Sequence, residues 1–269
     1  MKVQSKVIVV TGGGSGIGRE LILALLRKGA RVAAADINAA TLAETAELAG
    51  EMKSRLSTHV LNIADRPAVE AFPQAVIDAH GAVDGIINNA GVIQRFVKFK
   101  DLPYSEIERM ININLYGVIY MTKAFLPHLL ARPEAHIVNI SSMGGFLPVP
   151  GQTMYGAAKA AVKLFTEGLY SELSDTNVRV TVVFPGAIAT NITVNSGVMT
   201  PSIENADRSK MRVTPAPVAA QVILDGMESD SFRVLVGSDS RMMDTFYRLM
   251  PKRATKLIYS QMGELLKNV

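Results

Sequence analysis

The sequence predicts a single α/β domain in which helices cover both faces of a doubly wound parallel sheet. Three observations support this fold class. Short β-rich runs alternate with helical patterns along most of the 269 residues. The first run leads into the glycine-rich stretch TGGGSGIG at 11–18, where a strand is followed by a helix. No repeat, low-complexity segment or linker interrupts the chain, so one domain is the simplest organisation.

Strand and helix patterns follow one another in a regular order. Apolar residues at helical spacing, such as Ile17, Leu21 and Leu25, follow the first strand, and a long helical region is predicted at about 105–130. Right-handed crossovers leave the doubly wound sheet as the default topology. The predicted strands are 6–10, 31–36, 57–63, 83–91, 136–142 and 178–186, with a last helix–strand pair near 215–237.

Two segments depart from this alternation. The stretch from about 188 to 214 is rich in Thr, Asn, Ser and Asp and has no clear period, so we interpret it as a lid candidate. Beyond an expected α/β domain at 1–240, residues 241–269 form a C-terminal extension. It consists of two helix-like pieces separated by Pro251.

Composition argues against several classes of function. There is no cysteine, which removes disulfides and thiol nucleophiles, and the four histidines lack metal-ligand spacing, so no metal is expected. The first apolar run is too short for a signal peptide or a membrane span, and we expect a soluble, cytoplasmic protein. The net charge of +4 resides in the C-terminal extension, with six basic and two acidic residues. We therefore expect no nucleic-acid partner.

The glycine loop predicts a phosphate-binding site at the start of a helix. Its spacing is GxxxGxG; the strict GxGxxG pattern does not fit, and a Walker A motif would need Lys where Arg19 stands. Helix N–H groups and the helix dipole favour phosphate at such a turn. Taken alone, the loop is weak evidence, because a plain tight βα turn is also compatible with it. The predicted cofactor contacts are Gly12, Gly14, Ser15, Gly16, Ile17 and Gly18.

Asp36 indicates which dinucleotide the loop binds. It ends the second strand 18 residues after Gly18, where a carboxylate accepts hydrogen bonds from the adenosine ribose. The carboxylate repels a 2′-phosphate, and no Lys or Arg stands before Gly16 in the loop or directly after Asp36. The sequence therefore predicts NAD in preference to NADP. Asp36 also suits a turn or cap, and a methyltransferase could use the same loop and acid.

Four further stretches identify a family. NNAG (88–91), the Asn of NINLYG (112–117), SSMGG…YGAAK (141–159) and PGAIAT (185–190) occur in this order after TGGGSGIG. Together they resemble the short-chain dehydrogenase/reductase family over about residues 1–237. The resemblance implies a seven-stranded Rossmann sheet and hydride transfer between a nicotinamide and an alcohol or carbonyl. It also implies a homo-oligomer, dimer or tetramer, often built on the helices near 105–130 and 153–173.

The resemblance also assigns site residues. It implies a catalytic set with Tyr155 as acid–base, Lys159 as its partner, Ser142 as a hydrogen-bond donor to the substrate oxygen, and Asn114, whose backbone holds a water. The family often has Asp where this chain has Asn62, whose amide oxygen can still meet the adenine amino group. The remaining implied cofactor contacts are Asp36, Ile37, Asn62, Ile63, Asn88, Ala90, Gly91, Tyr155, Lys159, Pro185, Gly186, Ile188 and Thr190.

The proposed chemistry sets a requirement on Tyr155. Free tyrosine has a pKa of about 10 and is a poor base at neutral pH. Lys159 lies one helical turn further on the same face, and its ammonium is expected to lower the pKa of the phenol. A drop of two units corresponds to about 2.7 kcal/mol. Ser141 is rejected in favour of Ser142 because successive strand side chains face opposite sides.

The residues expected near the reacting carbon are apolar, which predicts a hydrophobic secondary alcohol or its ketone as substrate. Core packing is the strong alternative for them. The C-terminal extension is amphipathic and basic, so it packs on its own or a neighbouring subunit, or it lies weakly on a membrane surface. The expected substrate contacts are Ile93, Met143, Phe146, Val149 and Met154, with Phe96 and Leu147 nearby.

Two rival functions remain at the level of sequence. A regulator that senses NAD without turnover could use the same fold, but it has no need of Ser142, Tyr155 and Lys159 together. A methyltransferase has no use for the Tyr/Lys pair.

Overall fold

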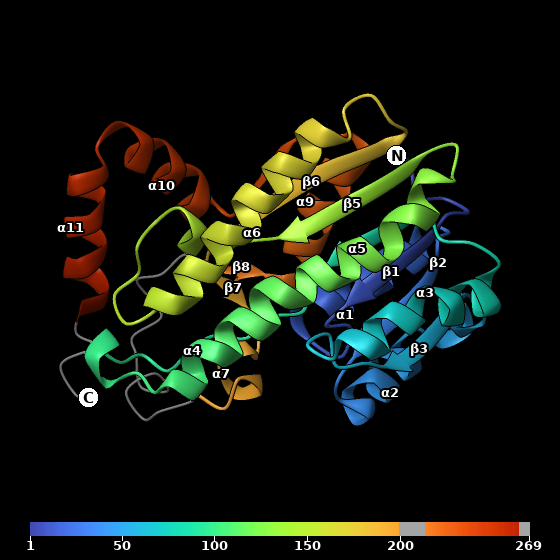
Figure 1. Ribbon diagram of the computed structural model, residues 1–269, viewed down its shortest axis with the longest axis horizontal. Helices are drawn as coiled ribbons and strands as arrows, with labels where there is room; N and C mark the ends of the chain where they lie inside the picture. The colour runs from blue at the N-terminus through green and yellow to red at the C-terminus, as the bar shows by residue number, and fades with distance from the viewer. Residues whose placement is uncertain (199–212, 264–269) are drawn as a thin grey trace.

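A seven-stranded sheet forms the centre of the protein, and every strand pairing in it is parallel (Figure 1). The computed structural model describes residues 1–198 and 213–263. This arrangement confirms the predicted fold class. In spatial order the strands are β3 (Leu56–Val60), β2 (Arg31–Asp36), β1 (Val7–Thr11), β4 (Gly85–Asn88), β5 (Ala135–Ile140), β6 (Val178–Pro185) and β9 (Arg233–Val236).

Helices cover both faces of the sheet and enclose two hydrophobic cores. Alternate side chains of β1 enter opposite cores, with Ile8 on one side and Val9 on the other. The first core lies under α1 (Gly16–Arg27), α2 (Ala39–Leu48) and α9 (Ala216–Glu228). The second lies under α3 (Arg66–His80), α5 (Gly117–Leu130) and α6 (Thr153–Glu172).

The long helical region predicted at 105–130 is not one regular helix. It consists of α4 (Tyr104–Ile111), a π-helical turn η3 (Asn112–Tyr116) and α5. The extra residue in a π turn shifts the backbone hydrogen bonding, and such turns frequently occur at functional sites. Sequence periodicity misses this feature because the apolar pattern continues through it.

The C-terminal extension is joined to the main sheet rather than separate from it. Its first helix, α10 (Ser238–Leu249), begins before the expected boundary at 240, and the buried Ser240 hydroxyl donates to the carbonyl of Phe184 over 2.8 Å. The second helix, α11 (Pro251–Met262), lies at the left edge of Figure 1. In the part of the chain that the structure describes, no helix is long and apolar enough to cross a membrane.

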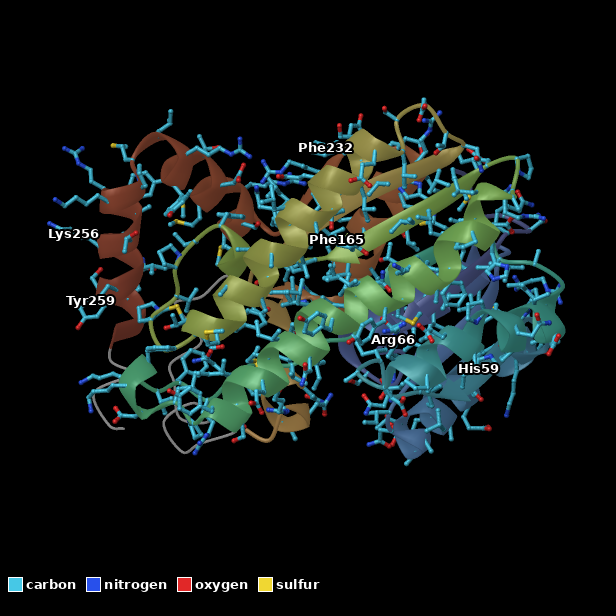
Figure 2. The ribbon with its side chains drawn as sticks, viewed as in Figure 1. His59, Arg66, Phe165, Phe232, Lys256 and Tyr259 are labelled. Atoms are coloured by element: carbon cyan, nitrogen blue, oxygen red, sulfur yellow. The ribbon has the colours of Figure 1, made fainter. Side chains whose placement is uncertain are left out.

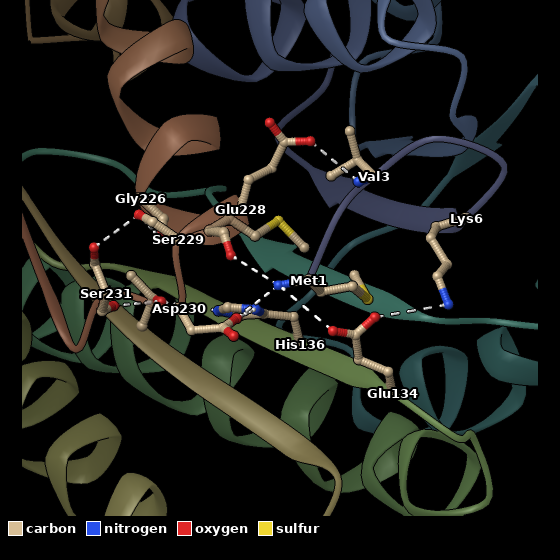
Figure 3. Close-up of polar contacts among 12 residues, drawn as sticks. Met1, Val3, Lys6, Glu134, His136, Gly226, Glu228, Ser229, Asp230 and Ser231 are labelled. Atoms are coloured by element: carbon tan, nitrogen blue, oxygen red, sulfur yellow. Dashed lines mark hydrogen bonds and ion pairs between the residues drawn. The ribbon is translucent and has the colours of Figure 1, made fainter.

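A buried polar cluster closes the amino-terminal edge of the sheet (Figure 3). The ammonium of Met1 lies 2.6 Å from Oδ1 of Asp230 and donates to the carbonyl of Met227. His136 on β5 is fully buried beside it, with Nε2 2.8 Å from the hydroxyl of Thr181. Burial, and then the nearby ammonium of Met1, lower the pKa of His136 to about 3.

This histidine makes the stability of the fold sensitive to acid. In the unfolded chain His136 binds a proton below about pH 6.5, whereas in the folded protein it stays neutral down to about pH 3. The free energy of unfolding therefore falls as the pH falls from about 6.5 to about 3. One such group contributes a slope of at most about 1.4 kcal/mol per pH unit. Urea unfolding at a series of pH values measures the slope.

The matched variants for this measurement are His136→Gln, which should show a shallower slope, and His128→Gln on α5, which should keep the parental one. Equal slopes for the parent and His136→Gln would contradict the assignment.

Candidate active site

A cavity of about 410 Å³ opens at the carboxyl ends of the central strands. Because the strands are parallel, these ends meet at one edge, and doubly wound sheets bind ligands where the strand order reverses. Here that point is β1, which has β2 on one side and β4 on the other. The predicted site residues that line the cavity are Gly12, Ser15, Gly16, Ile17, Asp36, Ile37, Asn62, Ile63, Ala90, Gly91, Ile93, Ser142, Tyr155, Lys159, Pro185, Gly186, Ile188 and Thr190.

The glycine loop has the geometry of an anion cradle. Gly12 and Gly16 have φ values of +70° and +53°, which favour glycine. A Cβ on Gly12 would lie 2.9 Å from the Cα of Ala90, so a side chain there would collide with the backbone of the neighbouring turn. Ser15 makes no side-chain cap to α1, which leaves N–H groups of the first turn available to a phosphate.

Gly14 and Gly18 do not line the cavity, although both were predicted as cofactor contacts. The N–H of Gly14 donates to Oδ2 of Asp36 over 2.9 Å and so orients that carboxylate. A Cβ on Gly18 would collide with the carbonyl of Gly12. Both glycines thus act on the loop's shape.

Asp36 and Arg19 determine the charge at the adenosine end. The second carboxylate oxygen of Asp36 accepts from the N–H of Asn38 over 2.9 Å, and each oxygen keeps a lone pair for a further donor. Arg19 donates to the carbonyl of Gly14 over 2.6 Å and to Glu44 over 2.7 Å. Its guanidinium is therefore engaged outside the cavity.

In the NNAG turn, the first asparagine does not reach the cavity. Asn88 is buried and donates to Thr122 on α5 over 3.1 Å and to Asn139 on β5 over 2.8 Å. Its neighbour Asn89 lines the cavity and donates to the carbonyl of Thr11 over 2.9 Å. Asn88 therefore joins the sheet to a helix, while Asn89 joins the turn to the glycine loop.

Ser142, Tyr155 and Lys159 all line the cavity, and a Cβ on Gly144 would lie 3.3 Å from the ring of Tyr155 and 3.5 Å from the hydroxyl of Ser142. Ser142 follows β5 and accepts the N–H of Gly144 over 3.0 Å, while Tyr155 is in the first turn of α6. Lys159 is 3% exposed, and its ammonium donates to the carbonyl of Ile140 over 2.9 Å. The rejected neighbour Ser141 donates to the carbonyl of Lys159 over 2.7 Å and so fastens α6 to β5.

Burial controls the protonation of this group. It raises the pKa of Tyr155 above its ordinary value, against the opposing effect of a hydrogen bond with Ser142. It also lowers the pKa of Lys159 to about 8. The expected lowering of the phenol pKa is therefore not found in this arrangement: the pKa of Tyr155 is raised by desolvation, and the contribution that opposes this rise comes from Ser142.

Asn114 lies behind the cavity in the π turn and does not line it. Its side chain is fully buried, accepting the N–H of Val92 over 3.0 Å and donating to the carbonyl of Val92 over 2.9 Å. A Cβ on Gly91 would lie 2.7 Å from Oδ1 of Asn114 and 3.2 Å from Nζ of Lys159. The three residues are thus adjacent, while a proton path through the backbone of Asn114 stays a prediction.

The predicted substrate residues are divided between two environments. Of the seven, only Ile93 lines the described cavity. Met143, Phe146 and Leu147 pack in a cluster with Met243, Ala254 and Ile258 of the C-terminal helices, which is the core alternative. Phe96, Val149 and Met154 are partly buried and do not line the cavity.

The predicted lid at 188–214 is described only in part, since residues 199–212 lie outside the described residues. Its start forms β7 (Ile188–Ala189), paired with β8 (Thr214–Pro215), and the short helix α7 (Ile192–Asn195). Asn195 lines the cavity and donates to the hydroxyl of Ser15 over 2.8 Å. This contact brings the segment to the glycine loop.

Two positioning residues have no sequence signal. Gln94 is fully buried, and its amide oxygen accepts the N–H groups of Met154 and Tyr155 over 2.9 and 3.0 Å. It therefore caps α6 at Tyr155. Asp239 on α10 accepts the N–H of Ala187 over 2.7 Å and holds the Pro185–Thr190 segment. Each contact joins residues far apart in sequence, so no local motif indicates it.

Comparison with known proteins identifies the family. The family model of the short chain dehydrogenases matches residues 6–199. SadH of Mycobacterium tuberculosis, named as an oxidoreductase, is 38% identical over 261 residues, which cover 95% of this chain and 94% of SadH. The chain belongs to the short-chain dehydrogenase/reductase family and is an oxidoreductase of that family.

Solved structures agree with this assignment. A short-chain dehydrogenase/reductase from Burkholderia phymatum in complex with NAD superposes with a TM-score of 0.82 at 25% identity, covering 93% of this chain and 96% of that one. A closed form of serine dehydrogenase with NADP⁺ has a TM-score of 0.78 at 26% identity, covering 86% and 93%. The same fold therefore accommodates both nicotinamide dinucleotides.

Replacing Gln94 tests its positioning role. Gln94→Leu leaves two helix N–H groups without an acceptor and loosens Tyr155, so kcat should fall by about tenfold or more while the Kd for NADH stays near the parental value. Gln94→Glu keeps the acceptor oxygen and should recover part of kcat. Steady-state kinetics and cofactor titration measure both.

The matched control for this prediction is Gln74→Leu on α3, where the side chain bonds only the exposed Asp78. The role of Gln94 is excluded if Gln94→Leu and Gln74→Leu have the same kcat.

Proposed function

We propose that the protein interconverts a hydrophobic secondary alcohol and its ketone with NAD(H) as cofactor and Tyr155 as acid–base. The observation that carries the proposal is that Ser142, Tyr155 and Lys159 line one cavity together with Asp36, which ends β2, while Ser142 follows β5 on the other side of β1 and β4. The non-catalytic alternative is not favoured, because a cofactor sensor has no use for three chemical groups at one point.

The cavity residues suit a nicotinamide dinucleotide. The two glycines with positive φ and the uncapped start of α1 match the needs of a pyrophosphate. The turn at Ala90 and Gly91 and the Pro185–Thr190 segment line the same cavity as Tyr155. When bound, the nicotinamide accepts or supplies the hydride.

The preference for NAD rests on charge. Asp36 is an anion where a 2′-phosphate would have to sit, and Arg19, the cation at the start of α1, is engaged with Gly14 and Glu44. A phosphate there would face Asp36 without a free cation in the loop. The relatives do not decide this point, since their solved structures contain NAD in one case and NADP⁺ in another.

The protein's own groups move one proton and orient one oxygen. The phenol of Tyr155, whose pKa is raised by burial, can donate its proton to a carbonyl oxygen. In the reverse direction the phenolate accepts the proton of the alcohol. The hydroxyl of Ser142 donates a hydrogen bond to the same oxygen, and Lys159, while charged, favours the phenolate.

The substrate class follows from the wall around these groups. Val92, Ile93, Ile113 and Ile192 line the cavity, which disfavours a charged substrate next to Tyr155. We also propose a homo-oligomer, supported by exposed apolar residues on the outer helices, such as Leu164 on α6 at 68% exposure. A cytoplasmic location stays a prediction.

Removing the phenol hydroxyl tests the mechanism. Tyr155→Phe deletes the proton donor, so kcat should fall by at least about a hundredfold, whereas the Kd for NADH should change little. Single-turnover absorbance at the nicotinamide band measures the first and fluorescence titration the second.

Tyr170→Phe on the same helix is the matched control and should keep the parental kcat. If Tyr155→Phe turns over a true ketone substrate as fast as Tyr170→Phe does, the proposed mechanism is contradicted.

Neutralising the carboxylate tests the cofactor preference. Asp36→Ala removes the repulsion toward a 2′-phosphate and the acceptors for the ribose, so the ratio of kcat/KM for NADP to that for NAD should rise by about tenfold or more. Asp78→Ala on α3 removes an exposed carboxylate elsewhere and should leave the ratio unchanged. An unaltered ratio in Asp36→Ala refutes the role of this residue.

A further inference from the structure

The outer side of α10 and α11 exposes large apolar side chains. Leu249 is 73% exposed, Met242 61% and Tyr259 60%, and Met250 and Leu257 are each more than a third exposed. Figure 2 shows Lys256 and Tyr259 pointing away from the body of the molecule at its edge. Isolated surface apolar residues need no explanation, but these lie on two consecutive helices.

The same side is basic. Exposed residues of α10 and α11 include Arg241, Arg248, Lys252, Arg253 and Lys256. The two acidic residues of these helices are engaged inward, Asp239 with the N–H of Ala187 and Asp244 with Arg233 over 3.1 Å. We call the exposed apolar and basic residues of 241–259 the C-terminal basic surface.

The inner side of the two helices is already fully occupied by this chain. Met243, Ala254 and Ile258 are buried around Leu147, in the loop between Ser142 and Tyr155. The contacts of Ser240 with Phe184 and of Asp239 with Ala187 fix α10 to the main sheet. The C-terminal basic surface is therefore presented by helices held in place, and its apolar residues are not needed for the core.

Charge indicates the partner. Residues 1–240 have no net charge, so the excess of +4 is concentrated at this end of the molecule. A surface with cations and apolar groups on adjoining helices matches the headgroup and acyl boundary of an anionic bilayer. A like copy of the chain would bring cations against cations, which disfavours self-association here.

We propose that the C-terminal basic surface binds anionic lipid bilayers, with α10 and α11 lying on the membrane. The apolar side chains enter the interface and the Lys and Arg side chains lie at the headgroups. One consequence rests on the proposed function: an apolar alcohol or ketone dissolved in the lipid is then concentrated beside the loop that joins Ser142 to Tyr155.

Vesicle sedimentation of the full chain tests the proposal. The protein should sediment with vesicles of phosphatidylcholine and phosphatidylglycerol, and not with phosphatidylcholine alone. High salt should weaken the binding, because screening reduces the attraction between the cations and the surface. Failure to sediment with the anionic vesicles at low salt overturns the proposal.

Two sets of substitutions locate the surface. The triple variant Lys252→Ala, Arg253→Ala and Lys256→Ala should bind anionic vesicles about a hundredfold more weakly, since each cation near the surface contributes about 1 kcal/mol. The matched control, Arg27→Ala, Lys53→Ala and Arg66→Ala, removes three exposed cations elsewhere and should bind as the parent does. Equal weakening in both variants overturns the assignment to α10 and α11.

A second variant tests the apolar part. Leu249→Ser with Tyr259→Ser keeps every charge and should also weaken binding, while circular dichroism should match the parent. Sedimentation velocity without lipid tests the alternative that another protein molecule covers this surface. If the triple variant of Lys252, Arg253 and Lys256 changes its oligomeric state but still binds vesicles, the surface makes protein contacts and the proposal is overturned.

The two proposals can fail separately. Turnover of a water-soluble ketone without vesicles should be the same in the cation triple and the parent. Vesicle binding together with absence of turnover counts against the proposed function alone.

Discussion

The connection between the end of β5 and helix α6 is the constraint on which the site depends. Lys159 donates to the carbonyl of Ile140 at the last residue of β5, and Ser141 donates to the carbonyl of Lys159. The two hydrogen bonds attach α6 to the end of β5 at two points, one through the side chain of Lys159 and one through its backbone carbonyl. Because Ser142 follows Ser141 and Tyr155 lies one turn before Lys159, the same connection places three functional groups against one another.

Contacts from distant segments complete this frame. Gln94 caps the first turn of α6 from the loop after β4, Asp239 holds the segment after β6, and Asn195 joins α7 to the glycine loop. Each is a single polar side chain that satisfies backbone groups or a hydroxyl at the edge of the cavity. An enzyme of this kind needs reacting atoms held closely in place, and these bridges provide the rigidity at few positions.

Burial has two opposite consequences in this molecule. At the carboxyl edge of the sheet burial raises the pKa of the Tyr155 phenol and lowers the pKa of Lys159 to about 8, so the two groups titrate further apart than they do in water. At the opposite edge it keeps His136 neutral, which links stability to pH. At the candidate active site, burial shifts the pKa values of two groups that the proposed reaction uses. At the opposite edge, burial of His136 makes the stability of the fold decrease in acid.

The sequence by itself determined the parallel sheet, the order of its strands and helices, and most of the cavity wall, because periodicity, the glycine loop and the ordered motifs are local signals. The family resemblance of its motifs also implied that Ser142, Tyr155 and Lys159 lie together. Tertiary structure alone decided that Asn88 and Gly18 act behind the cavity, that a π turn holds Asn114, and that Met143 and Phe146 pack against the C-terminal helices. It also decided the pKa of Tyr155 and the role of Gln94. These features depend on which buried polar groups meet across the fold, and residues such as Gln94 and Tyr155 are brought into contact only by the packing of the loop after β4 against α6.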